Sequence, residues 1–197
     1  VKPGEKVEFT ITVPTQTDLT PTRSDRNLTL TAKASVKSPS LAAAGAATDT
    51  PQATLTAKVN SDLKLTSVGR YYSESGATVG TGPLPPEVGK TTTYRITWAL
   101  SNAFNDVSDT VVTADLPPDS FWTGNQTTSS TGNIVFDPLS RTLTWTIGRL
   151  AAGSTASAAA SASFEVAITP TASQAGQLIA LVDNASARAT DTFTTTV

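Results

Sequence analysis

The sequence of 197 residues contains no cysteine, no histidine and no methionine. Without cysteine there is neither a disulfide framework nor thiol chemistry. Without histidine and cysteine, the common ligand sets for zinc, copper, haem and iron–sulfur clusters cannot be assembled, and Ser-His-Asp and Cys-His catalysis are excluded. These absences remove most classes of enzyme, and the sequence predicts a protein without a catalytic site.

Charge is also scarce. Charged residues make up 15% of the chain, the formal net charge is -2 and the pI is near 5.1. There is therefore no basic field to hold a polyanion, and we expect no nucleic-acid binding. The sequence has no run of about 18 apolar residues, so it predicts no membrane-spanning segment. Threonine-rich, charge-poor β sequence favours an extracellular location at the cell surface.

Alternation of apolar and polar residues is the main positive signal, and it is clearest between Lys90 and Leu116. One side of its first half carries Tyr94, Ile96, Trp98 and Leu100. This period of two is typical of a strand with one buried face. A second short β-branched run, 110–114, ends before Pro117 and Pro118. We interpret the stretch as the central hairpin of a β-sandwich.

Further strands are predicted from the same alternation at 7–13, 28–36, 53–59, 134–136, 143–147, 164–168 and 178–193, and from Leu63 onward. Residues 37–52 and 121–133 are predicted to be loops, and Asp137 to Ser140 a hairpin turn. From Leu63 this gives about seven strands, as expected of an immunoglobulin-like sandwich. The predicted fold class is all-β.

Two short matches suggest an internal repeat. The segments 1–4 and 9–13 resemble 150–153 and 164–168, and the tetrad Ala-Thr-Asp-Thr at 47–50 recurs at 189–192, 142 residues later. We therefore expect residues 1–58 to be the C-terminal half of a preceding module and 59–197 a complete one. Three strands bury too little apolar surface to fold alone, so an upstream piece or a neighbouring molecule should complete the first part.

Several stretches resemble a known family: NSDLKLTSVGRYYSESG, GPLPPEVGKTTTYRITWAL, FDPLSRTLTWTIG and FEVAITPTASQAGQ. They are similar to the conserved-repeat, immunoglobulin-like modules of large bacterial cell-surface proteins, closest to the repeat surface proteins of candidate phyla radiation bacteria. The resemblance covers roughly 59–197. It implies tandem immunoglobulin-like modules that serve as stalks, adhesin segments, fibres or surface layers.

Aromatic residues are the first candidates for a binding site. Trp98 and Trp145 stand in phase with aliphatic neighbours, which favours the core over a carbohydrate platform. Phe121 and Trp122 fall in the predicted loop after two prolines and are the candidate ligand-contact residues. Asn125 in the same loop is the candidate glycosylation site, the other two sequons beginning at Asn27 and Asn184 in predicted strands or at their edges.

Carboxylates are the only remaining acid–base groups. The pairs Asp106 with Asp109, Asp115 with Asp119, and Asp183 with Asp191 fall near strand ends, but no cleft for a glycosidase pair is predicted. We expect no cofactor. Calcium between modules stays open, with Asp62, Glu74, Glu87 and Asp137 as loose candidates and no calcium-loop motif. An isopeptide bond among Lys90, Asn184 and Glu165 is disfavoured, because Lys90 precedes its strand.

The sequence thus predicts a non-enzymatic extracellular module of a tandem-repeat surface protein. It would act as a spacer or assembly unit of a stalk, fibre or surface layer, its partners being neighbouring modules or copies of itself. Two alternatives remain: an adhesin that binds a glycan or host protein through loops such as 121–133, and an accessory domain of a secreted polysaccharide-active enzyme.

Overall fold

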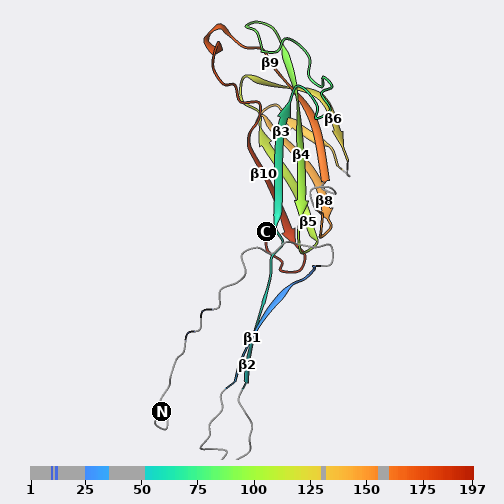
Figure 1. Ribbon diagram of the computed structural model, residues 1–197, viewed down its shortest axis with the longest axis vertical. Coiled ribbons are helices and arrows are strands. Elements are labelled where there is room, and N and C mark those ends of the chain that lie inside the picture. Colours follow the sequence, from blue (N-terminus) through green and yellow to red (C-terminus); the bar gives the residue numbers. More distant parts are fainter. Residues whose placement is uncertain (1–9, 11, 13–24, 36–51, 130–131, 155–159) are drawn as a thin grey trace, which may run out of the picture.

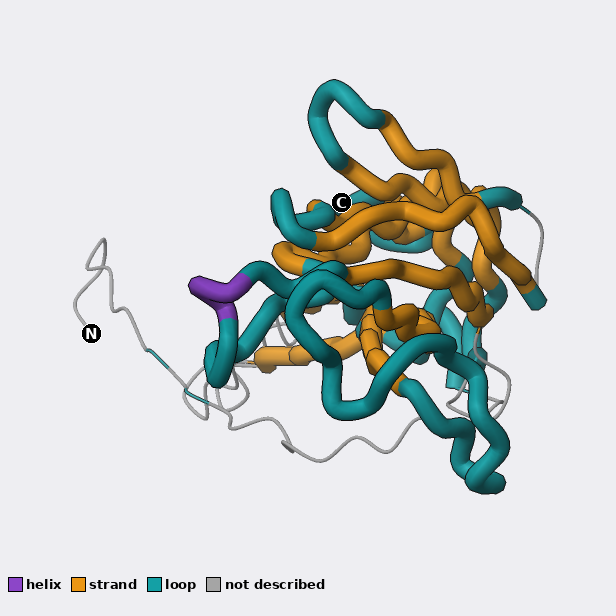
Figure 2. Tube along the Cα trace, turned by 90° about the horizontal axis from the view of Figure 1, so that it is seen from above, coloured by secondary structure: helices purple, strands orange, loops and turns teal. Residues whose placement is uncertain are grey.

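The computed structural model describes residues 10, 12, 25–35, 52–129, 132–154 and 160–197. The chain is all-β (Figure 1). The strands are β1 Thr29–Ser35, β2 Gln52–Lys58, β3 Leu63–Arg70, β4 Thr92–Asn102, β5 Val107–Asp115, β6 Ser120–Thr128, β7 Ile134–Asp137, β8 Thr142–Leu150, β9 Ala160–Ile168 and β10 Asp183–Asp191. A 3-10 helix, Ala172–Gln174, lies in the loop between β9 and β10 and is purple in Figure 2. No helix in these ranges has the length and apolar character needed to cross a bilayer.

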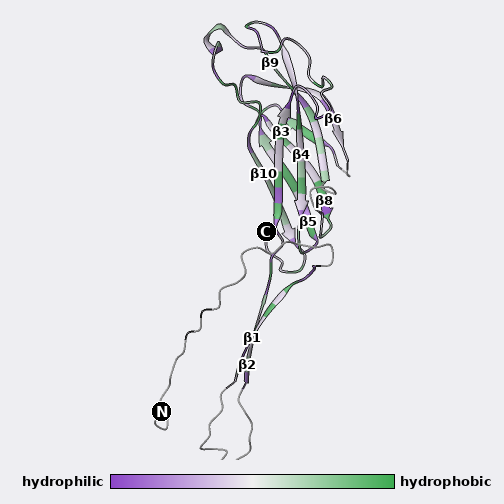
Figure 3. Cartoon of the chain, viewed as in Figure 1, coloured by the Kyte–Doolittle hydropathy of each residue, from purple (hydrophilic) through white to green (hydrophobic). Residues whose placement is uncertain are grey.

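Eight of the strands form two four-stranded sheets, in the orders β10-β5-β8-β7 and β3-β4-β9-β6. Every pairing is antiparallel. The two sheets enclose one hydrophobic core, and together they are called the sandwich below. Figure 3 shows the hydrophobic residues concentrated along its strands. The predicted all-β class is confirmed, and the pair of sheets is consistent with a β-sandwich module.

Alternation builds the core. In β9, and in β4 from Ile96 onward, every second residue is buried, as the period-two geometry of a strand with one inward face requires. The largest fully buried side chains are Trp98, Trp145 and Phe164, and the rings of Trp98 and Phe164 meet edge to face with centroids 4.7 Å apart. Edge-to-face contact suits the charge distribution of aromatic rings. The predicted core positions of Trp98 and Trp145 are therefore confirmed.

The predicted central hairpin is wrong. The strands β4 and β5 do not pair with each other: β4 lies between β3 and β9, whereas β5 lies between β10 and β8 in the other sheet. The connection from Ala103 to Asp106 carries the chain across the core, and Ala103, Phe104 and Asn105 are buried along it. Both strands point their apolar residues at the same core, but from opposite sheets. The alternation of apolar residues is the same in either arrangement, so it could not distinguish this crossing from a hairpin.

The predicted loop 121–133 is also wrong in its first part, because Ser120–Thr128 is strand β6, paired with β9. Its pairing shifts register between Trp122 and Gln126, around Gly124 with φ 88°. Such a bulge accommodates the residues that look like a turn in the sequence. The sandwich consequently has eight strands rather than seven. The predicted hairpin of β7 and β8, with its turn at Asp137, is confirmed.

Strands β1 and β2 form a separate two-stranded hairpin that extends from the lower end of the sandwich (Figure 1). Both were predicted as strands, within one residue of their observed bounds. Every residue of the hairpin is exposed. The strand predicted at 7–13 and the loop predicted at 37–52 fall almost wholly outside the described residues.

Candidate functional site

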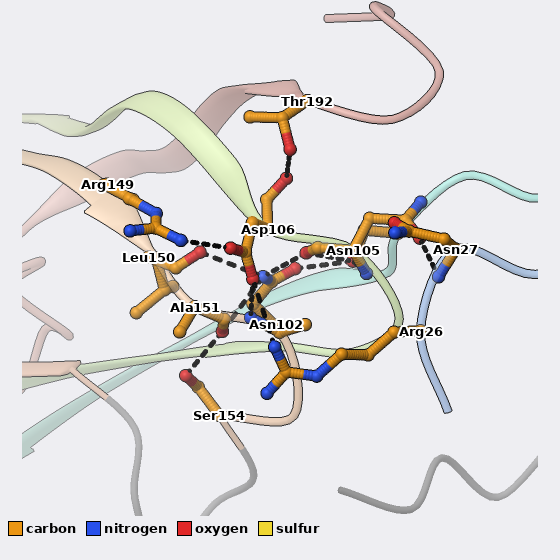
Figure 4. A network of polar contacts seen from close by, with 12 residues as sticks. Arg26, Asn27, Asn102, Asn105, Asp106, Arg149, Leu150, Ala151, Ser154 and Thr192 are labelled. Carbon is orange, nitrogen blue, oxygen red and sulfur yellow. Dashed lines mark hydrogen bonds and ion pairs between the residues drawn. The ribbon is translucent and has the colours of Figure 1, made fainter. Parts of the chain in front are cut away.

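Five polar side chains gather at the lower end of the sandwich, where the hairpin meets it. They are Ser61, Asn102, Asn105, Asp106 and Asp191, and we call this group the junction. Figure 4 shows Asn102, Asn105 and Asp106 with the polar groups around them. Asn105 is 0% exposed, Asn102 2% and Asp191 5%. A buried polar side chain costs free energy unless its hydrogen bonds are made. The junction therefore has to be judged by its partners.

Asn105 bonds with three separate parts of the chain. Its side-chain oxygen accepts the backbone N–H of Asn27 at 3.0 Å, just before β1. Its amide nitrogen donates to the carbonyl of Val59 at 2.8 Å, just after β2, and to Oδ2 of Asp191 at 2.7 Å. One buried amide thus holds both strands of the hairpin and the last strand of the sandwich.

Asp191 ends strand β10, and its carboxylate accepts three further hydrogen bonds. Its Oδ2 also accepts the N–H of Ser61 at 2.7 Å, and its Oδ1 accepts the N–H groups of Phe193 and Thr194 at 2.8 and 3.0 Å. Burial raises the pKa of Asp191, but the hydrogen bonds from Asn105, Thr194, Ser61 and Phe193 outweigh it and lower the pKa below the ordinary 3.8. The carboxylate therefore stays ionised inside the junction.

Ser61 and Asn102 close the network from the other side. The Ser61 hydroxyl donates to Oδ1 of Asn102 at 2.6 Å. The amide nitrogen of Asn102 donates to the carbonyls of Asn105, Leu150 and Ala151 at 2.7, 3.3 and 3.2 Å. The crossing between the two sheets is thereby tied to the end of β8, and the short connection is fixed in place.

Asp106 occupies the more exposed edge of the junction, with 22% of its side chain accessible. The N–H of Ala152 donates to it at 2.8 Å, Arg149 forms a hydrogen-bonded ion pair with it, and Arg26 lies 3.9 Å away. These three groups, led by the Ala152 N–H, hold the pKa of Asp106 below its usual 3.8. Its backbone carbonyl accepts both the N–H and the hydroxyl of Thr192.

The polar groups of the junction hold the hairpin on the sandwich. Both carboxylates have lowered pKa values, whereas a general acid working near neutral pH needs a raised one. Lys58, the last residue of β2, adds a further tie: its ammonium donates to the carbonyl of Phe193 at 2.8 Å and lies 4.6 Å from the centre of the Phe193 ring. The hairpin and the sandwich are thus joined through side chains as well as through the backbone.

The two candidate ligand-contact residues, Phe121 and Trp122, lie on opposite faces of β6. Trp122 is half-buried against the core, with its ring centre 5.6 Å from that of Phe164 and 6.3 Å from that of Phe136. Phe121 points the other way and is 51% exposed. Because neighbours in a strand project from opposite faces, the two cannot form one platform. The prediction that Phe121 and Trp122 lie in a loop is therefore corrected, since both belong to β6.

The candidate glycosylation site, Asn125, is exposed but lies within β6 rather than in a loop. Its amide nitrogen donates to Oε1 of Glu165 at 3.1 Å. Glu165 is thus occupied with Asn125, while Asn184 donates to Asp115 at 3.0 Å and Lys90 pairs with Glu87 at 2.6 Å. The three residues considered for an isopeptide bond are not brought together.

The calcium candidates are dispersed as well. Glu74 pairs with Arg70 at 2.9 Å, Glu87 pairs with Lys90, and Asp137 caps its own turn through Leu139 and Ser140. Within the described ranges no three acidic side chains gather in a way that could hold a metal ion. Among the carboxylates considered in pairs, Asp106 and Asp191 both belong to the junction, where Asp106 contacts Arg149 and Ala152 and Asp191 contacts Asn105 and Ser61.

A shallow groove of about 520 Å³ lies at the opposite, upper end of the sandwich. It is formed by the loop before β4 and the loop between β9 and β10, and is lined by Pro85, Pro86, Val88, Tyr94, Leu178 and Ile179, among others. Val88 is 50% exposed and Leu178 fully so. Burial raises the pKa of Tyr94 above 10.0. This apolar groove is a feature that could bind a ligand.

The chain matches no protein-family model and no curated protein sequence. The site must accordingly be interpreted from its own geometry.

Proposed function

We propose that this chain is a non-enzymatic structural module of an extracellular, tandem-repeat cell-surface protein, with an immunoglobulin-like sandwich as its folded unit. The observation that carries the proposal is the junction. The buried amide of Asn105 and the buried carboxylate of Asp191 make hydrogen bonds that fix a β-hairpin to the sandwich. A built connection between two β units is what an assembled array requires.

The way the chain enters and leaves the sandwich refines the mechanical role. The N–H of Ser61, just before β3, donates to Asp191 at the end of β10, so both connections lie at the same end. A sandwich attached in this way is held at one end, the junction, and does not lie in line between a preceding and a following module. The module then serves to display a folded body beside an assembled backbone, which suits a fibre or surface layer more than an axial spacer.

An adhesin remains the second candidate, and the groove at the upper end favours it. The end away from the junction is the one that a hanging sandwich would present outward. Its exposed apolar side chains, including Val88 and Leu178, are of the kind found at binding sites. The candidate contact surface therefore moves from Phe121 and Trp122 to the groove.

Surface labelling of intact source cells tests the proposal. Lys33, Lys64 and Lys90 are exposed and react with a membrane-impermeant amine reagent if the module lies outside the cell. We expect peptides carrying these labelled lysines from intact cells, with a cytosolic protein as the unlabelled control. Labelling that occurs only after lysis would refute an extracellular role.

A further inference from the structure

A second groove lies on the outer face of the sheet β3-β4-β9-β6, the face that is turned away from the core. Side chains of β3, β4 and β9 form its floor, and the loop between β3 and β4 forms its rim. Its volume is about 390 Å³, and small-ligand sites span roughly 300 to 1,000 Å³. We call it the outer groove; among the residues that line it are Val68, Arg70, Val79, Arg95, Thr97 and Ser163.

The strand register sets the side chains of the outer groove in rows. In one row, Arg70 of β3 lies directly opposite Arg95 of β4. In the next, Thr97 of β4 lies between Val68 of β3 and Ser163 of β9, and the hydroxyls of Thr97 and Ser163 share a hydrogen bond of 3.1 Å. Because directly opposite residues in an antiparallel pair project from the same face, one row carries guanidinium groups and the next carries hydroxyls beside an apolar side chain.

The two arginines differ in their partners. Arg70 forms an ion pair with Glu74 of the rim, with 2.9 Å between Nη2 and Oε1. Arg95 is exposed, and its guanidinium makes no ion pair or hydrogen bond with any residue that the structure describes. Glu165 is its register partner on β9 but does not line the groove, and its Oε1 accepts the amide of Asn125 at 3.1 Å. Two cations and one carboxylate therefore line the outer groove, which leaves one positive charge uncompensated.

The rim of the outer groove is fixed by its own hydrogen bonds. The N–H of Val79 donates to the carbonyl of Tyr71 at 2.8 Å. The N–H of Ser73 donates to the carbonyl of Ala77 at 2.8 Å, and the hydroxyl of Ser73 in turn accepts the N–H of Ala77 at 3.1 Å. A groove that is already formed costs less ordering of the chain when a ligand binds.

The side chains of the outer groove fit a sugar that carries a carboxylate. The guanidinium of Arg95 presents a planar fork of N–H donors that matches the two oxygens of a carboxylate. The hydroxyls of Thr97 and Ser163 both donate and accept, as the hydroxyls of a sugar require. Val68 and Val79 offer apolar contact to the C–H groups of a sugar ring. A neutral sugar would leave the positive charge of Arg95 uncompensated.

An acidic peptide fits the outer groove less well. Extended peptides are bound mainly through main-chain hydrogen bonds at the edge of a sheet. The floor of the groove is centred on β4, an inner strand that is hydrogen-bonded to β3 on one side and to β9 on the other. Its backbone groups are therefore occupied, and the floor presents side chains alone.

We propose that the outer groove binds an acidic sugar residue of a polysaccharide, with the carboxylate on Arg95 and the sugar hydroxyls on Thr97 and Ser163. This site goes beyond the structural role proposed above and does not depend on it. The nearby carboxylate of Glu165 repels the ligand and limits the affinity. The outer groove is distinct from the apolar groove at the upper end, whose described lining contains no charged side chain.

A glycan array of uronate and sialate oligosaccharides, each printed beside its methyl ester, tests the site with a concentration series of the 197-residue chain. We expect binding to an acidic oligosaccharide and about tenfold weaker binding to its ester, because the ester lacks the charge that Arg95 pairs with. Arg95→Gln should weaken binding to the acid about tenfold, and Glu165→Gln should strengthen it about twofold by removing a repelling charge. The matched control, Arg188→Gln, removes an exposed arginine from β10 in the other sheet and should bind as the wild type does. Thermal unfolding followed by tryptophan fluorescence should be the same in the wild type and in every variant.

Equal binding of an acid and its ester, or unchanged binding by Arg95→Gln, would overturn the proposal. So would the absence of binding to every acidic sugar by protein whose thermal unfolding is intact. Polyglutamate printed on the same array checks the peptide alternative: binding to it alone, lost in Arg95→Gln, would assign the groove to a peptide and overturn the proposal too. None of these results bears on surface labelling of Lys33, Lys64 and Lys90, so failure of the sugar site and failure of the proposed function can be told apart.

Discussion

The N–H of Ser61 donates to Oδ2 of Asp191 at 2.7 Å, although the two residues are 130 positions apart in the chain. The first precedes the first strand of the sandwich and the second ends its last strand. This one bond fixes the two connections of the sandwich side by side. The neighbouring Asn105 extends it to the hairpin, so the same cluster joins the hairpin to the sandwich.

Replacing Asn105 with alanine should destabilise the protein by about 2 to 4 kcal/mol, because the buried Asp191 carboxylate, the Val59 carbonyl and the Asn27 N–H each lose a partner. Urea unfolding followed by tryptophan fluorescence measures the change. The control is Asn125→Ala, an exposed residue in β6, which should stay within about 0.5 kcal/mol of the wild type. Equal effects of the two variants would show that the junction contributes no special stability.

Stability should fall on acidification because of Asp106 and Asp191. Both have pKa values in the folded protein below 3.8, so their contribution is present above the unfolded value and is lost as the pH falls through the folded one. We expect the urea midpoint to drop between about pH 5 and pH 2. The chain has no histidine to add a transition near neutrality.

The variants Asp106→Asn and Asp191→Asn assign this pH dependence to the junction. Each should be less stable than the wild type at pH 7 and should lose less stability on going to pH 3, because the amide does not titrate. A pH dependence unchanged by either substitution would place its origin in other carboxylates.

Trp122→Ala should behave as a core substitution and cost about 3 kcal/mol, since its ring packs against Phe164 and Phe136. The adjacent Phe121→Ala, on the exposed face, should cost about 0.5 kcal/mol or less. Urea unfolding compares them, and a glycan array checks for binding. If Trp122→Ala left the free energy of unfolding unchanged but abolished binding to a glycan, Trp122 would be a ligand-contact residue, and its assignment to the core would be wrong.

Alternation was sufficient to locate most strands of the sandwich but not to pair them. Ile96, Trp98 and Leu100 identify β4 because their period of two is independent of the partner strand. The pattern of β5 is of the same kind, so alternation does not show whether β4 and β5 pair or lie in opposite sheets. Asn102 at the end of β4 and Asn105 in the connection look, in sequence, like residues of a solvated turn, but both are buried.

Strand β6 and the junction were missed for a related physical reason. The segment that begins Ser120-Phe121-Trp122 continues with Thr, Gly, Asn and Gln, residues typical of loops, and is a strand because β9 offers it an edge to pair with. Long-range pairing of this kind overrides local preference. Likewise, the sequence does not show that Ser61, Asn105 and Asp191 come together, because Asp191 lies 130 positions from Ser61 and 86 from Asn105.

Force spectroscopy on two handle positions tests most directly the claim that the chain enters and leaves the sandwich at one end. Single cysteines for the handles can be introduced cleanly, because the chain has none. Handles at Ser35 and Thr195 pull on the junction and should peel β3 and β10 away strand by strand, breaking a few hydrogen bonds at a time. Handles at Ser35 and Ser173 pull along the strands and load many perpendicular hydrogen bonds of β3, β4 and β9 together. The account predicts a clearly lower unfolding force for the first pair. Equal forces, or a higher force between Ser35 and Thr195, would contradict it.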